Sequence, residues 1–262
     1  MVREITEGIY WLQGDYVASV GEAPEWHDTS VDLHSPINAY LLVDDRSLLF
    51  DTLSPADAEE TVRMVRDALD GQSLDYIAPS HGESPHAGNT HVLVEEFPEA
   101  EVLAPAKGDL HDHYYLGDAT RVQPGLTRDL GGKTVEFVDA PFIDTGMHTW
   151  LFERTTRTLF VVDWLAFPHD ETECMQFVDE MDRTDEELER MMWLSTGHVF
   201  AWFEFVDTDK TEAMIDYLAE RYGPEILAPA HGQVIRADAD RYLEMMKDVM
   251  AEHSEGHLPT LV

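Results

Sequence analysis

One short stretch of the chain gathers side chains that bind metal ions. His81, Glu83 and His86 lie close together, directly after the apolar run Tyr76–Ala78. Alternate residues of an extended loop project to the same side, so we expect His81 and Glu83 to share one ion. His86, which follows a turn, would reach a neighbouring ion. The chain has a single cysteine, so any metal site must be built from histidine and carboxylate ligands.

Residues from the second half of the chain match this stretch. His231 follows the apolar run Ile226–Leu227 much as His81 follows its own strand, and both histidines precede a glycine. Loops at strand ends are held by a rigid sheet, so we expect the two histidines to face one site from two halves of the fold. Asp163 ends the apolar run Thr158–Val162. A carboxylate there is costly to desolvate without a partner, and a bridging metal ion is a natural partner.

Two residues compete for one further ligand position. Asp144 and His148 both lie ahead of Asp163 in the chain. Imidazole suits iron and zinc, and the site already holds two candidate carboxylates, so ligand chemistry favours His148. Asp144 would then either bind the ion as well or hold a ligand histidine in one tautomer.

The elements that must position these residues alternate between β-rich and helical blocks. We predict strands at Ile9–Leu12, Asn38–Val43, Ser47–Phe50, Tyr76–Pro79, Glu101–Leu103, Thr134–Val138, His148–Phe152, Thr158–Val162 and Ile226–Leu227. We predict helices at Pro55–Leu69, Ala87–Phe97, Lys107–Tyr115, Asp185–Ser195, Lys210–Tyr222 and Asp238–Glu252. No linker divides the chain, so we expect one α/β domain over residues 1–262, with two sheets packed face to face and helices outside.

The composition argues against several classes of partner. The 262 residues contain 53 acids against 17 lysines and arginines, a formal net charge of −36. Such a field repels phosphate backbones and anionic lipid, so we expect neither a nucleic-acid nor a membrane partner. No apolar run resembles a spanning helix or a secretion signal, which predicts a cytoplasmic protein. An evenly acidic, lysine-poor surface stays hydrated in concentrated salt, which indicates a halophilic protein.

The ordered series of motifs resembles the metallo-β-lactamase-like, oxygen-binding diiron domain of flavodiiron proteins. The motifs that carry the resemblance are Ile9–Leu12, Asn38–Leu42, Leu49–Thr52, Pro79–Gly88, Leu130–Thr134, Asp139–Pro141, Asp163, Ala228–Gly232 and Tyr242. Glu83 stands where hydrolytic relatives usually have histidine, and a hard carboxylate suits iron. The resemblance implies an αββα sandwich of the metallo-β-lactamase type with a binuclear site at one edge. It also implies one or two iron ions as cofactor, with zinc as the alternative metal.

Carried over residue by residue, the resemblance implies an altered site. The family's ligands fall on His81 and Glu83 for the first iron, on His86 and His231 for the second, and on Asp163 as the bridge. The family's aspartate before the last loop histidine is Pro85 here, so the second ion loses one anionic ligand. The family's spacing before Asp163 matches Asp144 rather than His148, so register and ligand chemistry disagree about the third histidine.

The activity that the resemblance implies is the binding or reduction of dioxygen or nitric oxide at two ferrous ions, with electrons from a flavin. The chain ends at Val262, where a fused flavodoxin module would begin, and has no flavin phosphate loop, so we expect it to bind no flavin. A separate flavoprotein or a rubredoxin-like donor would supply the electrons, and we expect a homodimer.

Two other functions stay open. The first is metal-dependent hydrolysis, as in other members of the superfamily, although an aspartate at the position of Pro85 commonly orients the attacking water and is missing here. The second is a binding or sensor protein that keeps a degenerate site.

Overall fold

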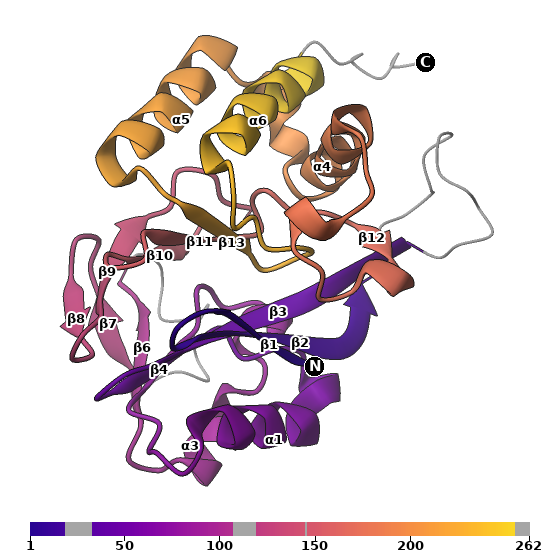
Figure 1. Cartoon of the computed structure of the whole chain (residues 1–262). Helices are drawn as coiled ribbons and strands as arrows, with labels where there is room; N and C mark the ends of the chain where they lie inside the picture. The colour runs from indigo at the N-terminus through magenta and orange to yellow at the C-terminus, as the bar shows by residue number, and fades with distance from the viewer. Residues whose placement is uncertain (19–32, 107–118, 145, 255–262) are drawn as a thin grey trace, which may run out of the picture.

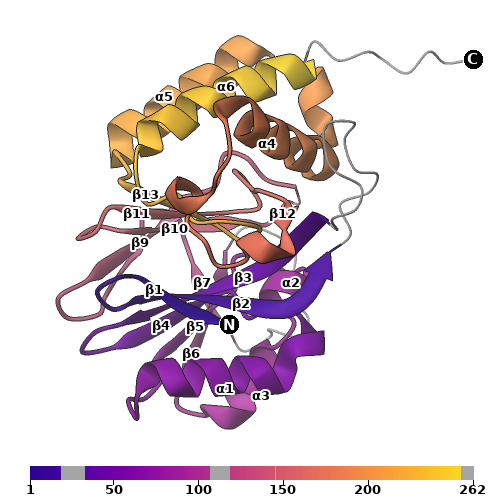
Figure 2. The same ribbon diagram turned by 45° about the vertical axis from the view of Figure 1, so that its right-hand side comes forward.

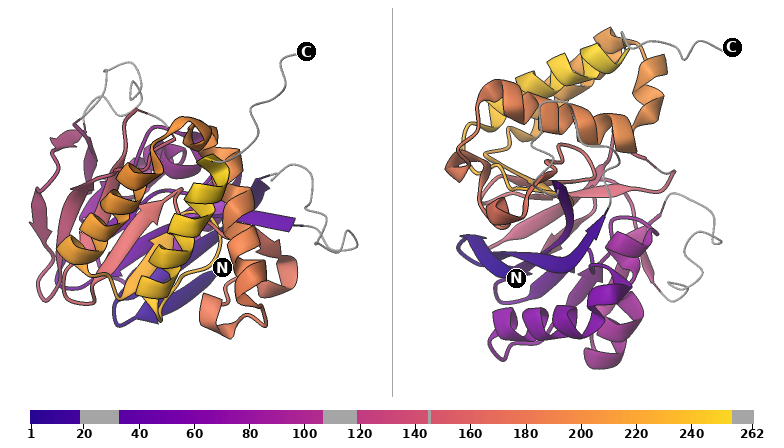
Figure 3. Two further views of the ribbon diagram at one scale, coloured as in Figure 1. Left: turned by 90° about the horizontal axis from the view of Figure 1, so that it is seen from above. Right: turned by 90° about the vertical axis from the view of Figure 1, so that its right-hand side faces the viewer.

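Two β-sheets pack face to face at the centre of the molecule, and helices cover both outer faces (Figure 1). This is a computed structural model that describes residues 1–18, 33–106, 119–144 and 146–254. The first half of the chain forms most of one sheet and its helices, and the second half forms most of the other sheet and its helices (Figure 3). The predicted αββα sandwich is therefore confirmed.

The first sheet is mixed. Its strands run in the order β1-β2-β3-β4-β5-β6-β7, and β12 pairs with β3 beside this path. Their bounds are β1 Val2–Thr6, β2 Ile9–Ala18, β3 Leu33–Val43, β4 Ser47–Phe50, β5 Tyr76–Ala78, β6 Glu101–Pro105, β7 Thr120–Val122 and β12 His169–Asp170. Strands β1 to β4 pair antiparallel, whereas β4, β5, β6 and β7 pair parallel.

The second sheet is mostly antiparallel. Its order is β13-β11-β10-β9-β8, with only the β11 and β13 pair parallel among these described strands. The bounds are β8 Thr127–Asp129, β9 Thr134–Asp139, β10 Thr149–Glu153, β11 Thr158–Val162 and β13 Ile226–Pro229. Each sheet therefore contains a parallel pair whose carboxyl ends lie side by side.

Strand β3 shows how the layers are held together. Its alternate residues Ile37, Ala39 and Leu41 pack with Leu93 and other side chains of the helices under the first sheet. Tyr40 and Leu42 point the other way and belong to the core between the two sheets. Because both faces are covered, residues 39–43 of the strand form a continuous apolar run, whereas a half-exposed strand would alternate with polar residues.

The helices fall into two groups that cover opposite outer faces (Figure 2). Under the first sheet lie α1 Ala58–Leu69, α2 Ser84–Ala87 and α3 Thr90–Glu96. Over the second sheet lie α4 Asp185–Val199, α5 Thr208–Tyr222 and α6 Ala239–Ser254. Short 3₁₀ turns occur at Pro55–Asp57, Glu171–Glu173, Val178–Glu180 and Ala201–Phe205. None of the described helices is long and apolar enough to cross a membrane.

The predicted helix over Ala87–Phe97 is confirmed in part, since α3 covers Thr90–Glu96 but begins later than predicted. The separate short helix α2 ends at Ala87, and Asn89 interrupts the helical path between the two. The Asn89 amide donates to the carbonyls of Thr52 and Ser54, and side-chain bonds of this kind compete with helix formation. The predicted helix over Lys107–Tyr115 lies outside the described residues. Strands β1, β7, β8 and β12 are absent from the sequence prediction, since they are short or lie at an edge.

Charge repulsion predicts that stability depends on salt. The 53 acids exceed the 17 lysines and arginines, and most ion pairs among the described residues involve exposed side chains. We expect the melting temperature to rise between low and molar KCl, because the screening length falls to about 3 Å at 1 M. Each kcal/mol regained should raise it by roughly 2–4 °C. Calorimetry across a KCl series measures this, and a flat or falling curve would contradict the halophilic interpretation.

Candidate metal centre

The candidate site lies where the carboxyl ends of the parallel pairs β4–β5 and β11–β13 meet. In the first sheet, Asp51 follows β4 and His81 follows β5 shortly after its end. In the second sheet, Asp163 follows β11 and His231 follows β13. The two edges are joined by a backbone hydrogen bond from Thr149, at the start of β10, to the carbonyl of Ser80. Four segments far apart in sequence therefore deliver polar side chains to one buried place.

Four histidine rings converge on the carboxylate of Asp163. The Nε2 atoms of His86 and His231 lie 3.2 and 3.0 Å from Oδ1 of Asp163. The Nε2 atoms of His148 and His81 lie 3.1 and 3.9 Å from Oδ2. Each oxygen of one aspartate thus faces two imidazole nitrogens. A carboxylate in this arrangement would be able to bridge two adjacent ions, each held by two of the histidines.

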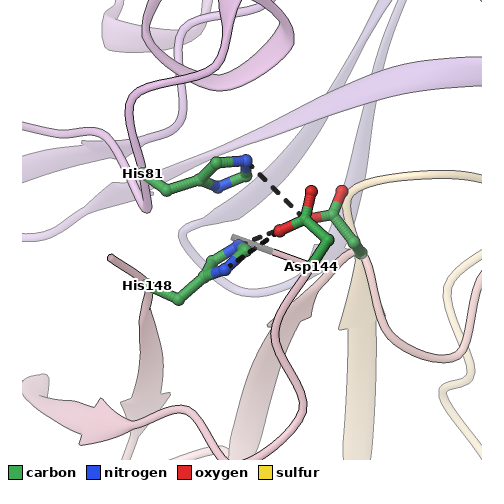
Figure 4. A group of neighbouring side chains, drawn as sticks. His81, Asp144 and His148 are labelled. Atoms are coloured by element: carbon green, nitrogen blue, oxygen red, sulfur yellow. Dashed lines mark hydrogen bonds and ion pairs between the residues drawn. The ribbon is translucent and has the colours of Figure 1, made fainter. Parts of the chain in front are cut away.

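The ligand atoms also form two groups of the right size for metal ions. One group contains His81, Asp144, His148 and Asp163, and the other contains His86, His231 and again Asp163. Within each group the candidate atoms lie within 4.8 Å of one another. We call these the first position and the second position. Figure 4 shows His81, Asp144 and His148 of the first position, with the rings of His81 and His148 one above the other.

Each of the four rings has an oxygen atom close to Nδ1, which forms a hydrogen bond in every case except that of His148. His86 Nδ1 lies 2.8 Å from Oδ2 of Asp51, and His148 Nδ1 lies 3.2 Å from Oδ1 of Asp144. The other two rings have neutral partners: the Ser80 hydroxyl at 3.0 Å from His81 Nδ1 and the Pro36 carbonyl at 3.1 Å from His231 Nδ1. Partners of this kind fix the tautomer, so that Nε2 is the nitrogen left to bind a metal.

Local backbone geometry aims these side chains. Val162, the residue before Asp163, has φ of 55°, and the pairing register of β11 with β13 shifts between Phe160 and Val162. A β-branched residue with positive φ is strained, and a register shift of this kind turns the next side chain toward the site. Gly232 has φ of +96°, and an added Cβ would collide with the backbone of Phe167. Glycine there lets the chain turn directly after His231.

The electrostatics of the site favour a bound cation. Burial holds the pKa of His81 well below its usual value, and the rings of His86 and His148 lower it further. Burial alone would also lower the pKa of His86, but Asp163 and Asp51 outweigh it and raise that pKa well above the usual value. Burial would raise the pKa of Asp163, yet His86 and the other rings hold it well below its usual value. The cluster therefore keeps Asp163 ionised and His81 neutral, the forms that bind metals, whereas a metal ion at His86 would have to displace the proton from that ring.

The residues fit a pair of first-row transition ions. Nε2 of His81 is fully buried and makes no hydrogen bond to any described residue. A buried imidazole nitrogen without a partner is costly unless it binds something. Ligand atoms bound to one ion at about 2.1 Å lie roughly 3.0–3.4 Å apart, which is close to the separations seen around Asp163. Mixed imidazole and carboxylate ligands suit iron, zinc and related ions.

The predicted site residues are brought together, with differences in how they lie. Glu83 Oε2 lies 3.9 Å from Nε2 of His81, and its side chain is 47% exposed, so Glu83 stands at the mouth of the first position. Burial raises its pKa, as do Asp144 and Asp163. Pro85 lies in the first turn of α2, next to His86. Nε2 of His148 faces Asp163, whereas Asp144 lies at its Nδ1.

Sequence reasoning missed Asp51 as part of the site. Its carboxylate accepts a hydrogen bond from the Ser80 backbone at 2.7 Å and also contacts His86. The signal was present, because Asp51 ends the buried strand Ser47–Phe50 just as Asp163 ends Thr158–Val162. In both places a carboxylate directly after a fully apolar strand marks a residue of the site, because such a group is costly to bury without a partner.

Comparisons with known proteins agree with this geometry. A sequence model of the metallo-beta-lactamase superfamily matches residues 34–183. The chain is 28% identical to the nitric oxide reductase of Moorella thermoacetica, over 92% of this chain and 59% of that protein. It is 25% identical to the anaerobic nitric oxide reductase flavorubredoxin of Salmonella arizonae, over 97% of this chain and 52% of that protein. The chain thus spans little more than half the length of these curated relatives.

Solved structures share the fold at lower identity. Rubredoxin oxygen:oxidoreductase from Desulfovibrio gigas superposes with a TM-score of 0.73 at 18% identity, over 97% of this chain and 61% of that one. The flavodiiron protein from Giardia intestinalis gives a TM-score of 0.73 at 19% identity, over 97% and 59% of the two chains. Because the family model covers more than half of its residues, the chain belongs to the metallo-β-lactamase superfamily.

Proposed function

We propose that this chain is a non-haem diiron domain that binds or reduces nitric oxide or dioxygen with electrons from a separate flavoprotein. The observation that carries the proposal is the convergence of four imidazole Nε2 atoms, two on each oxygen of Asp163. The similarity to two nitric oxide reductases supports the choice of reaction. Those relatives are longer than this chain, so they have residues outside the matched part that are available for electron delivery.

Each ion would be held by two histidines and the shared Asp163. In the first position His81 and His148 would be joined by Glu83, and in the second position the ligands would be His86 and His231. Two ferrous ions would supply electrons to the gas and neutralise the charge that develops on it. The net reaction with nitric oxide consumes two molecules, two electrons and two protons, and yields nitrous oxide and water.

A cluster of buried aromatic side chains begins at the residue after Asp163. Trp164 follows Asp163 directly and stacks on Trp150, with ring centroids 5.4 Å apart. Phe142 packs on the ring of Trp164 with a centroid distance of 4.8 Å. All three side chains are buried. Glu83, at the exposed side, is the group best placed to exchange protons with solvent.

Metal analysis and gas consumption test the proposal together. The protein should be purified anaerobically in high salt, without chelator or nickel affinity, and then reconstituted with ferrous iron. We expect one tightly bound and one weakly bound ion, because the second position has a single carboxylate. Nitric oxide or oxygen consumption, followed with an electrode, should be slow and should depend on an added reduced flavoprotein.

The double variant His81→Ala plus His231→Ala is the control, since it removes one ligand from each position. It should lose both the metal and the donor-dependent consumption. Wild-type protein that stays metal-free after growth in iron-replete and zinc-replete medium would overturn the metal site. A metal-loaded protein that consumes neither gas but hydrolyses an ester or lactam would favour the hydrolytic alternative instead.

A further inference from the structure

We propose that Asp144 is a positioning residue: it holds Nδ1 of His148, so that Nε2 of this ring binds the ion in the first position. This inference rests on the proposed metal site, and it concerns the role of one carboxylate within it. It also explains how His148 fills the ligand position although its spacing to Asp163 differs from that of the family.

The two nitrogens of His148 face two different carboxylates. Nε2 lies 3.1 Å from Oδ2 of Asp163. Nδ1 lies 3.2 Å from Oδ1 of Asp144, which Figure 4 shows beside the ring. A ring that binds a metal through Nε2 carries its proton on Nδ1, and a buried N–H group needs an acceptor. No described residue hydrogen-bonds to Nδ1 of His148 with good geometry, so Asp144 is the acceptor within reach.

The second position has the same arrangement of carboxylate, ring and Asp163, and there the carboxylate forms a hydrogen bond to the ring. His86 Nδ1 hydrogen-bonds to Asp51 at 2.8 Å, while its Nε2 faces the other oxygen of Asp163 at 3.2 Å. Each position therefore combines one ring backed by a carboxylate with one ring backed by a neutral oxygen. Asp144 is the counterpart of Asp51 in this pattern.

The charge balance also favours a positioning role. Under the proposed function, Asp163 and Glu83 would be the anionic ligands of the first position, beside two imidazoles. A third carboxylate bound directly would surround a dication with three negative charges, in a site that burial makes costly for excess charge. Placed behind His148, the Asp144 carboxylate, which is 15% exposed, raises the basicity of the ring without occupying a coordination site.

Zinc binding with NMR of the histidine rings tests this assignment. Zn²⁺ alone is the probe, because it is diamagnetic. Long-range proton–nitrogen correlation spectra should show His148 bound to zinc through Nε2, with a Nδ1 proton shifted downfield by its carboxylate partner. Asp144→Asn should move that proton upfield, and Asp144→Ala should weaken zinc binding at one position by about 10–100-fold.

Asp51→Asn is the matched variant. It should shift the Nδ1 proton of His86 and leave the signals of His148 unchanged. If Asp144→Ala removes one zinc ion while His148→Ala leaves affinity intact, Asp144 is itself a ligand and the positioning role is wrong. Unchanged zinc affinity and unchanged His148 signals in both Asp144 variants would also overturn it. Zinc binding as expected, together with no gas consumption, would leave the positioning role standing and reject only the proposed reaction.

Discussion

Asp163→Ala should remove nearly all bound metal from the protein. Its two oxygens are the only atoms of the described site that face all four histidine rings, two rings on each side. Removing the carboxylate takes one ligand from both positions and leaves buried imidazoles facing each other without an anion between them. We expect the affinity for both ions to fall by more than about 100-fold, beyond the loss typical of outer partners. Elemental analysis of metal per chain after gel filtration measures the change.

Two further variants separate ligand loss from misfolding. Asp163→Asn keeps the shape of the side chain, so it should fold while losing the negative charge that offsets two cations. Asp129→Ala removes an exposed carboxylate that also ends a strand of the second sheet, and it should keep the wild-type metal content. A folded Asp163→Asn protein that retains the wild-type metal content would show that Asp163 does not bridge.

The sequence predicts both the strands that carry the site and the polar residues that follow their carboxyl ends, because each is a local feature of the sequence. Buried parallel strands are short apolar runs, and polar residues directly after them stand out, as His81, Asp163 and His231 do. The pairing of β4 with β5 and of β11 with β13 then follows from the superfamily fold. Each of these inferences needs only a few neighbouring residues and the rule that parallel strands share an edge.

The choice between Asp144 and His148 could not be made from the sequence. Spacing before Asp163 indicated Asp144, but the loop between β9 and β10 is not a regular element, so residue counts do not fix where its side chains lie. Its position is set by tertiary contacts, such as the bond from Trp202 Nε1 to the Ile143 carbonyl. Asp51 was missed for a related reason, since its role depends on β4 lying beside β5 and on the ring of His86 reaching it.

Pro85→Asp should raise metal occupancy toward two ions per chain. The second position has two histidines and a share of Asp163, and Pro85 adjoins one of those histidines, His86. An added carboxylate supplies the negative charge that a neutral imidazole or a water does not. We expect the second ion to bind at least about 10-fold more tightly. Removing a residue that only hydrogen-bonds to a metal ligand already lowers metal affinity by about that factor, and a direct ligand should contribute no less. Titration with ferrous iron under anaerobic conditions, with metal counted per chain, measures this.

The backbone should tolerate this change. Pro85 lies in the first turn of α2, where no helical hydrogen bond is lost and where an acidic side chain interacts favourably with the helix end. Without the proline ring the unfolded chain gains conformational entropy, which lowers the free energy of unfolding by about 0.4–1 kcal/mol. Pro85→Ala has the same cost. Pro85→Ala is therefore the matched control, and it should keep wild-type occupancy. Equal occupancy in the aspartate and alanine variants would mean that residue 85 does not reach the second ion, and that the weak position has some cause other than the missing carboxylate.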